Sequence, residues 1–337
     1  MSKCNYCAFF SQACARPDWE TYTDNVCREI KYWGQRLNHP HVPTIFFGGG
    51  TPSLIPTEHF HQIIKTANDC FTLNKNAEIT LESNPGTLSH EKLAEFKHGG
   101  VNRLSVGVQR LNNNELNFMG RKHTVDDATR LIHTAQDMNL NVSADFIYGI
   151  PGDTTKSVLQ ICQWINDIGI QHCSLYELTI EPNSVFGKMN LNMPSNDEMA
   201  QMYMAIEDGL RLNKYEVSNY AAYGAECKHN QNIWDGGAYI GIGRGGAGRV
   251  FQDNVWYEQM GNNELMQAMD DTARATEKVI MGLRTIRGCQ LTDDVKSVID
   301  IDWISAHPEL IQIHDGRLRA TKMGMLVLDE VTLKTVK

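Results

Sequence analysis

Two cysteines near the start of the chain, Cys4 and Cys7, have the spacing of metal ligands. A Cys-x-x-Cys pair can be a redox dithiol, half of a zinc site or part of an iron–sulfur site. The sequence holds no second Cys-x-x-Cys pair, which disfavours zinc. A metal site needs more than two ligands, so the pair predicts that further ligands come from elsewhere.

A run of glycines offers a second kind of chemistry. In residues 48–53 three glycines would let a ligand approach the backbone and its N–H donors, which makes Gly49, Gly50 and Thr51 candidate binding residues. No Gly-Lys-Ser/Thr sequence follows, so the segment is not a P-loop. Residues 241–246 match G-x-G-x-x-G, but no clear helical pattern comes after them, and we interpret them as a loop.

Four polar side chains form a candidate ligand-binding set, namely Glu82, Gln109, Arg121 and Asp145. Each of them taken alone is equally well explained as an ordinary strand-end or loop residue. Taken together, they suit a ligand that carries hydroxyl groups, an amine and a carboxylate.

His229 is a separate candidate, in a segment rich in Gly, Asn, His and Trp over residues 223–250. We expect this segment to be an irregular functional loop. A single histidine is more often a surface or core residue than a ligand. The neighbouring Asn230, Asn232 and Trp234 favour a functional role for the segment.

These residues need a scaffold, and the pattern up to residue 180 supplies one. Apolar, β-rich runs predict strands at 43–50, 78–85, 102–109, 141–151 and 172–180, and helical patterns occupy 18–37, 57–72, 89–98, 124–139 and 154–168. This alternation predicts βαβ units around a parallel sheet. In such folds ligands bind at the carboxyl ends of the strands, where the glycine run and most of the polar set lie.

The second half of the chain follows a different pattern. A helix is predicted over 195–213, and the last 75 or so residues read as helices with one hairpin at 311–321. The Asp315-Gly316 pair is a strong turn signal for that hairpin. Helices followed by such a hairpin resemble a small winged-helix module, with a boundary near residue 260.

Composition limits the classes of protein to which the chain can belong. The net charge of -9 argues against nucleic acid as the main partner. No run of about 18 apolar residues occurs, so no transmembrane segment is expected. The nine cysteines are mostly single and no hydrophobic signal region is present, so we expect reduced thiols and a cytoplasmic protein.

The chain resembles the radical S-adenosylmethionine (SAM) proteins, in the branch that contains the oxygen-independent coproporphyrinogen III oxidases and the HemW heme chaperones. The resemblance runs from residue 1 to about 250 and rests on these segments, in this order: CNYCAF, IFFGGGTPSL, EITLESNPGT, GVNRLSVGVQ, DFIYGIPGDT, LYELTIEPNS and KHNQNIWDGGAYIGIG. It implies an α/β fold, a partial (β/α) TIM-like barrel over 1–180. A connecting region at 181–260 and a small helical or winged C-terminal domain at 261–337 would follow.

The same resemblance implies an iron–sulfur site. In this family a C-x3-C-x2-C motif holds a [4Fe–4S] cluster, which delivers an electron to SAM and generates a 5′-deoxyadenosyl radical. Cys4 and Cys7 match the second and third cysteines of that motif. The first cysteine and the first barrel strand would precede Met1, so we expect an N-terminally truncated chain that holds iron poorly.

The resemblance also implies roles for the other candidates. Tyr6 corresponds to the aromatic residue beside the cluster, and Gly49, Gly50 and Thr51 to the loop that meets the SAM amino group. The remaining residues of the SAM pocket would be Glu82, Gln109, Arg121 and Asp145.

Four positions bear on the choice between the two branches. The oxidases carry a further cysteine where this chain has Phe9, as the HemW branch does. His229 matches a heme-binding histidine of HemW proteins, whereas Ile233 and Ala247 replace a tyrosine and a second histidine. We therefore predict a HemW-like chaperone that binds heme and passes it to a membrane-bound respiratory enzyme. The alternatives are a coproporphyrinogen III oxidase and a degenerate SAM- or heme-binding protein without a cluster.

Overall fold

The computed structural model describes residues 3–7, 14, 16–260 and 266–337. The chain forms two compact units, of which the first comprises Met1–Asn213 with Ser218–Ala225 and the second Lys214–Val217 with Glu226–Lys337. The predicted division into 1–180, 181–260 and 261–337 stays a prediction, and residues 261–265 at its second boundary lie outside the described residues.

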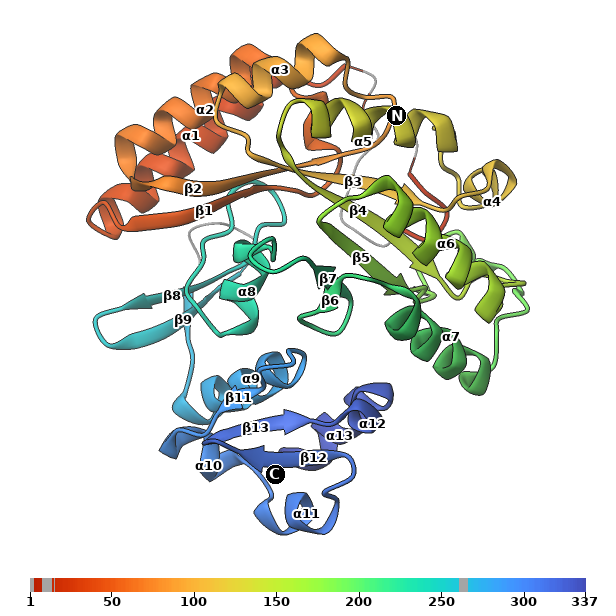
Figure 1. Cartoon of the computed structure of the whole chain (residues 1–337). Helices are drawn as coiled ribbons and strands as arrows, with labels where there is room; N and C mark the ends of the chain where they lie inside the picture. Colours follow the sequence, from red (N-terminus) through yellow and green to blue (C-terminus); the bar gives the residue numbers. More distant parts are fainter. Residues whose placement is uncertain (1–2, 8–13, 15, 261–265) are drawn as a thin grey trace. The chain divides into compact units, whose positions relative to one another are not determined.

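A curled, mostly parallel sheet organises the first unit (Figure 1). Its strand order is β1-β2-β3-β4-β5-β7-β6, and each of the pairs from β1 to β5 is parallel, whereas β7 runs antiparallel to β5. The strands are β1 (His41–Phe47), β2 (Thr72–Ser83), β3 (Arg103–Gln109), β4 (Asn141–Tyr148), β5 (His172–Glu177), β6 (Asn213–Lys214) and β7 (Asn219–Ala221). The mostly parallel order of the sheet confirms the prediction from the alternating pattern, and its curl matches the partial barrel that the family resemblance implies.

Helices cover the outer face of this sheet (Figure 1). They are α1 (Trp19–Arg36), α2 (Thr57–Cys70), α3 (His90–His98), α4 (Asn113–Phe118), α5 (Val125–Asp137), α6 (Thr155–Ile168) and α7 (Asn196–Gly209), with 3-10 turns at Pro52–Leu54 and Phe186–Lys188. Thr124, Thr154 and Ser195 begin their helices with capping boxes, in which side chain and backbone donors at the helix start are satisfied reciprocally.

Alternation along the strands separates an apolar face from a polar one. In β3, Leu104, Val106 and Val108 are fully buried. Because side chains alternate across a strand, the intervening Ser105 and Gly107 point to the other face. The side chain of Ser105 there donates a hydrogen bond to Asp145 of β4. The concave face of the curled sheet is therefore lined with polar groups, as a ligand-binding barrel requires.

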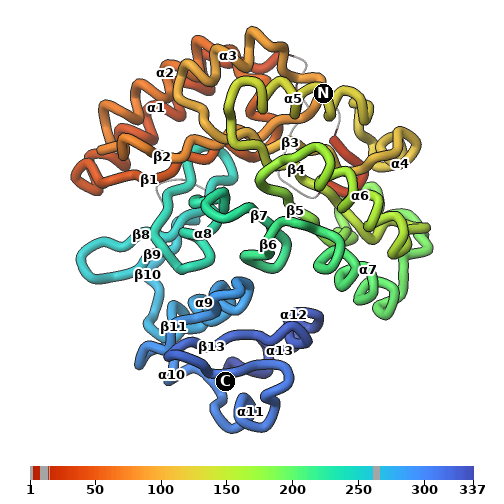
Figure 2. The backbone as a smooth tube through the Cα atoms, in the orientation of Figure 1, coloured from red at the N-terminus to blue at the C-terminus, as the bar shows by residue number. Residues whose placement is uncertain are grey.

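The second unit combines a β-meander with a helical module, and Figure 2 traces its course. The elements are α8 (Lys228–Trp234), β8 (Gly248–Gln252), β9 (Val255–Gln259), β10 (Met266–Ala268), α9 (Asp271–Leu283), β11 (Cys289–Gln290), α10 (Asp293–Val298), α11 (Ile301–Ala306), β12 (Ile311–His314), β13 (Arg317–Ala320), α12 (Lys322–Leu326) and α13 (Leu328–Thr335). The predicted hairpin is confirmed, since β12 pairs antiparallel with β13 and both Asp315 and Gly316 have positive φ angles.

One expectation for this unit is wrong. Residues 223–250 are not irregular throughout, because Lys228–Trp234 form α8 and Gly248–Gln252 form β8. The strand β8 follows residues 241–246 where a dinucleotide-binding motif would need a helix, in agreement with our interpretation of these residues as a loop. Among the described residues, no helix has both the length and the apolar character needed to cross a membrane.

Candidate functional site

The turn that carries Cys4 and Cys7 is attached to the first unit through Asn5. The N–H of Cys7 donates to the carbonyl of Cys4 at 3.2 Å, which closes the turn. The N–H of Asn5 donates to the carbonyl of Met119 at 2.9 Å, and its side-chain Nδ2 donates to the carbonyl of Phe118 at 2.7 Å. Both half-buried cysteine side chains are thereby held beside the end of α4.

Tyr6 lies between these cysteines and the predicted SAM-binding residues. Its ring packs on a buried cluster that includes Met119, and the guanidinium carbon of Arg121 lies 6.0 Å from the ring centroid. Burial raises the pKa of the Tyr6 phenol far above its ordinary value, and the positive charge of Arg121 opposes that shift. The phenol is therefore neutral at physiological pH, and the ring connects the cysteine turn to Arg121.

The glycine loop after β1 meets Glu82 at the end of β2. The backbone N–H of Gly49 donates to Oε2 of Glu82 at 3.2 Å. Gly49 has a φ of +113°, which only glycine adopts without strain. Burial, followed by the charge of Asp145, raises the pKa of Glu82 to about 7, whereas the bond from Gly49 opposes the shift.

Arg121 and Gln109 converge above Gly107. Arg121 donates from Nη1 to Asn84 Oδ1 at 2.7 Å, and Asn84 donates from Nδ2 to Thr51 Oγ1 at 3.2 Å. A Cβ atom placed on Gly107 would lie 2.7 Å from Arg121 Nη2 and 2.8 Å from Gln109 Nε2. Nε of Arg121 is buried and has no hydrogen-bond partner among the described residues, so an acceptor is missing at this point.

Asp145 accepts hydrogen bonds from three serine hydroxyls on three strands. Ser174 donates at 2.7 Å and Ser143 at 3.3 Å, and Ser105 donates to the other carboxylate oxygen. Burial raises the pKa of Asp145, and the serine hydroxyls oppose this shift by stabilising the ionised form. Asp145 is thus a deep, oriented acceptor close enough to Glu82 to raise its pKa.

The structure therefore brings together most residues of the predicted set. The carboxylates of Glu82 and Asp145 lie near each other, and Asp145 lies near the guanidinium group of Arg121, whose Nε lacks an acceptor among the described residues. Carboxylates accept from an ammonium or hydroxyl group, and a guanidinium donates to a carboxylate. The arrangement fits a zwitterionic amino-acid group attached to a hydroxyl-bearing part, which is the chemistry of SAM. The residues are Tyr6, Gly49, Gly50, Thr51, Glu82, Gln109, Arg121 and Asp145, all in the first unit.

His229 is a half-buried residue of α8 and belongs to the second unit. The end of this helix is anchored by polar contacts. Asn232 donates from Nδ2 to the carbonyl of Ala238 at 2.9 Å, and Arg287 forms two bonds of 2.9 Å with Asp235. Trp234 lies beneath Arg284, whose guanidinium carbon is 5.2 Å from the indole ring centroid.

Three residues of this site are absent from the predicted SAM-binding set. Asn84 is a polar residue directly after the strand that ends with Glu82 and Ser83, so its position was a usable signal. Asn5 and Gly107 gave no comparable signal, because their roles depend on contacts with α4 and Arg121. Phe9, which was used to choose between the two branches, lies outside the described residues. Over the described part of the chain, no group of at least three His, Cys, Asp or Glu side chains is arranged to hold a metal ion.

Comparison with known proteins places this geometry in a family. The sequence pattern of the Radical SAM superfamily matches residues 1–165. The chain is 33% identical over 258 residues to the heme chaperone HemW of Buchnera aphidicola from Acyrthosiphon pisum, which covers 75% of this chain and 69% of that protein. It is also 33% identical to HemW of Escherichia coli, covering 74% of this chain and 68% of the relative.

Two further matches extend over nearly the whole chain. A zebrafish (Danio rerio) protein named radical S-adenosyl methionine domain-containing protein 1, mitochondrial, is 31% identical over 98% of this chain and 83% of its own length. The structure of coproporphyrinogen III oxidase HemN from Escherichia coli superimposes with a TM-score of 0.82, covering 99% of this chain and 87% of that one. At 16% identity this likeness concerns the fold alone. The chain belongs to the HemW family of radical SAM proteins.

Proposed function

We propose that this protein is a heme chaperone, which binds heme and passes it to a heme-requiring protein with support from SAM and a [4Fe–4S] cluster. The observation that carries the proposal is the 33% identity to HemW heme chaperones over three quarters of the chain. The polar rim of the barrel supports it, because its donors and acceptors fit SAM.

The residues of the first unit take complementary roles toward SAM. We propose that Glu82 and the backbone at Gly49 and Gly50 meet the amino group, and that Nε of Arg121 donates to the carboxylate. That donor is buried and lacks a partner among the described residues, so a bound carboxylate would satisfy it. Asp145, oriented by its serines, and Gln109 would accept from the hydroxyls.

The iron–sulfur site fits only in part. Cys4 and Cys7 are held in one turn beside Tyr6, as two ligands of one cluster need to be, but the described residues supply no third ligand there. When it is bound, the cluster supplies the redox chemistry that acts on SAM. For this chain we propose the two thiolates as ligands and derive no step from the cluster.

Heme binding is assigned to α8. Neutral imidazole is a common axial ligand of heme iron, and His229 is half-buried on a helix whose far end is anchored by Asp235 and Asn232. We propose His229 as a ligand of the heme iron. The heme recipient that we propose is a membrane-bound respiratory enzyme, as the resemblance implies.

The test of the heme proposal is a titration of the full chain with hemin. The wild type should take up about one heme per chain with a defined Soret band, and His229→Ala should shift that band and weaken binding. His314→Ala is the matched control, because His314 is an exposed histidine of the same unit. An unchanged spectrum and heme affinity in His229→Ala would remove His229 from the proposal.

A further inference from the structure

Gln109 lies in a strained turn at the end of β3. The N–H of Arg110 donates to the carbonyl of Val108 at 2.9 Å, which closes a three-residue turn around Gln109. The φ of Gln109 is +68°, a conformation that side-chain-bearing residues rarely adopt. A three-residue turn with a positive φ at its centre is a rare and strained structure that persists only when its surroundings hold it. The pairing of β3 with β4 shifts register at the same place, between Gly107 and Gln109.

This turn determines where the amide of Gln109 lies. Its Nε2 atom is brought to within 2.8 Å of the position that a Cβ atom on Gly107 would occupy, beside Arg121 and Asn84. Arg121 belongs to the predicted SAM-binding set, and Asn84 accepts a hydrogen bond from it. A relaxed backbone at residue 109 would carry the amide elsewhere, so some group must resist relaxation.

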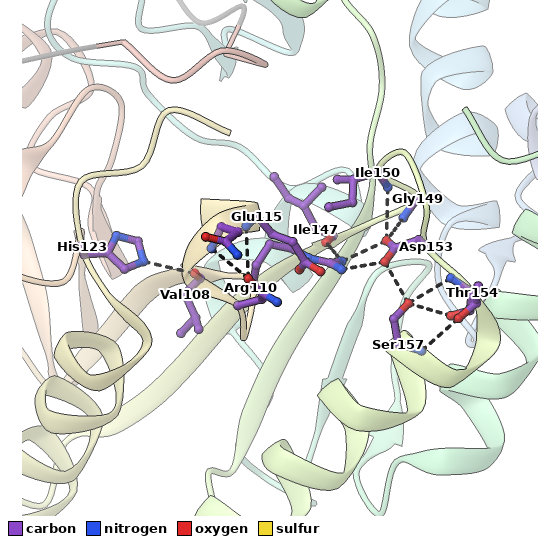
Figure 3. A network of polar contacts seen from close by, with 12 residues as sticks. Val108, Arg110, Glu115, His123, Ile147, Gly149, Ile150, Asp153, Thr154 and Ser157 are labelled. Carbon is purple, nitrogen blue, oxygen red and sulfur yellow. Dashed lines mark hydrogen bonds and ion pairs between the residues drawn. The ribbon is translucent and has the colours of Figure 1, made fainter. Parts of the chain in front are cut away.

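The side chain of Arg110 provides that resistance. It is almost fully buried and makes a two-pronged ion pair with Asp153, from Nη1 to Oδ2 at 2.9 Å and from Nη2 to Oδ1 at 2.6 Å (Figure 3). Nε donates to Glu115 at 2.6 Å, and Nη1 also donates to the carbonyl of Ile147 at 3.0 Å. The paired charges are both removed from water, so they hold each other in one geometry.

Asp153 is itself fixed from the opposite side. Its carboxylate accepts from the backbone N–H of Gly149 at 2.8 Å, from that of Ile150 at 3.2 Å and from the hydroxyl of Ser157 at 2.8 Å. Figure 3 shows these bonds converging on Asp153 from the loop after β4 and the start of α6. On the other side of the turn, Nε2 of His123 donates to the carbonyl of Val108 at 3.2 Å.

We propose that Arg110 and Asp153 are positioning residues of the SAM pocket, whose buried ion pair holds the strained turn that directs Gln109 toward the ligand. This inference rests on the proposed function, since it deepens the account of the SAM-binding rim. Neither residue reaches the ligand in this account, and both act through Gln109.

A double-mutant cycle on the full chain tests the inference, with SAM affinity measured by calorimetry. Gln109→Ala should weaken SAM binding by about fivefold to tenfold, the size of one neutral hydrogen bond. Asp153→Asn should weaken it by a similar factor, and Asp153→Asn combined with Gln109→Ala should be no more than about twofold weaker than either variant. Asp69→Asn is the matched control, because it makes the same change in an exposed ion pair with Lys65 and should leave the affinity unchanged.

A second variant separates positioning from loss of stability. Arg110→Met combined with Asp153→Asn leaves no unpaired buried charge at the pair, so it should fold with a melting temperature near that of the wild type. It should still bind SAM about fivefold to tenfold more weakly. Melting curves of all variants accompany the calorimetry.

Three results would overturn the inference. Wild-type affinity in the Arg110→Met/Asp153→Asn variant would show that the pair does not position the pocket. Losses that multiply in the Gln109→Ala/Asp153→Asn variant would show that Asp153 does not act through Gln109. A wild-type chain that binds no SAM would refute the proposed SAM site itself, and the inference with it. This outcome differs from the other two, in which the wild type still binds SAM.

Discussion

SAM binding should depend on pH through the carboxyl group of Glu82. Burial, followed by the charge of Asp145, raises the pKa of this group to about 7. Below that pH the ligand-free protein carries a protonated Glu82, which cannot form a charge-assisted bond with the amino group of SAM. Because the raised pKa belongs to an acid, the competent ionised form is gained as pH rises, and SAM affinity should rise with it.

The size of the effect follows from the ionised fraction. With a pKa of about 7, Glu82 is about 3% ionised at pH 5.5 and about 75% ionised at pH 7.5. The apparent dissociation constant is the intrinsic constant divided by the competent fraction, so SAM should bind about 25-fold more tightly at pH 7.5 than at pH 5.5. The range ends at pH 7.5 because α-amino groups such as that of SAM titrate near pH 8.

The assay is calorimetric titration with SAM at pH 5.5, 6.5 and 7.5, in two buffers that differ in ionisation enthalpy. The wild type should release about one proton on binding near pH 6, where most Glu82 is protonated. Glu82→Gln should bind more weakly at pH 7.5 and vary by less than about threefold across the range. A wild-type affinity that does not change with pH, or a Glu82→Gln variant with the same slope as the wild type, would refute this reasoning.

Three further predictions concern other parts of the chain. Asp145→Ala should weaken SAM binding by about tenfold to a hundredfold, the range of a charge-assisted hydrogen bond, with heme affinity unchanged in the hemin titration. Gly107→Ala should weaken SAM binding by about tenfold, because the new Cβ would displace Arg121 and Gln109. Calorimetry would measure this loss of SAM affinity, and a melting curve would show that the variant is still folded. Asp153→Asn alone should lower the free energy of unfolding, measured by urea titration, by about 3 kcal/mol, because it leaves the buried charge of Arg110 poorly paired. Adding Arg110→Met to the same chain should recover most of this loss.

The sequence predicted the barrel because its signals are local. Strands such as β3 and β4 combine closely spaced apolar residues with polar ones on the other face, and helices such as α5 and α6 begin at threonine caps. The set of Glu82, Gln109, Arg121 and Asp145 was also predicted from sequence, and its role in binding SAM stays a prediction. Glu82 and Gln109 lie at strand ends, whereas Asp145 lies within β4 and Arg121 in the loop between α4 and α5. All four match the motifs of a known family, so they could be proposed before the fold was known.

The parts that sequence could not supply depend on contacts between distant segments. Arg110 and Asp153 are 43 positions apart, and nothing in either local pattern indicates a buried pair. The helix α8 has no buried residues and no side-chain cap, so its sequence lacked the signs of a helix. Its end is held by Arg284 and Arg287, which come much later in the chain, and a helix so short depends on such contacts.

Transfer of heme from the loaded protein is the measurement that tests the central claim most directly. The full chain would be loaded with one equivalent of hemin and mixed with heme-depleted membrane vesicles that contain a respiratory cytochrome. The account predicts that the Soret band of the donor declines as the cytochrome spectrum returns, faster than from free hemin at the same concentration, and that His229→Ala abolishes this advantage. A wild-type chain that binds no heme, or that holds heme without passing any to the cytochrome, would contradict the account.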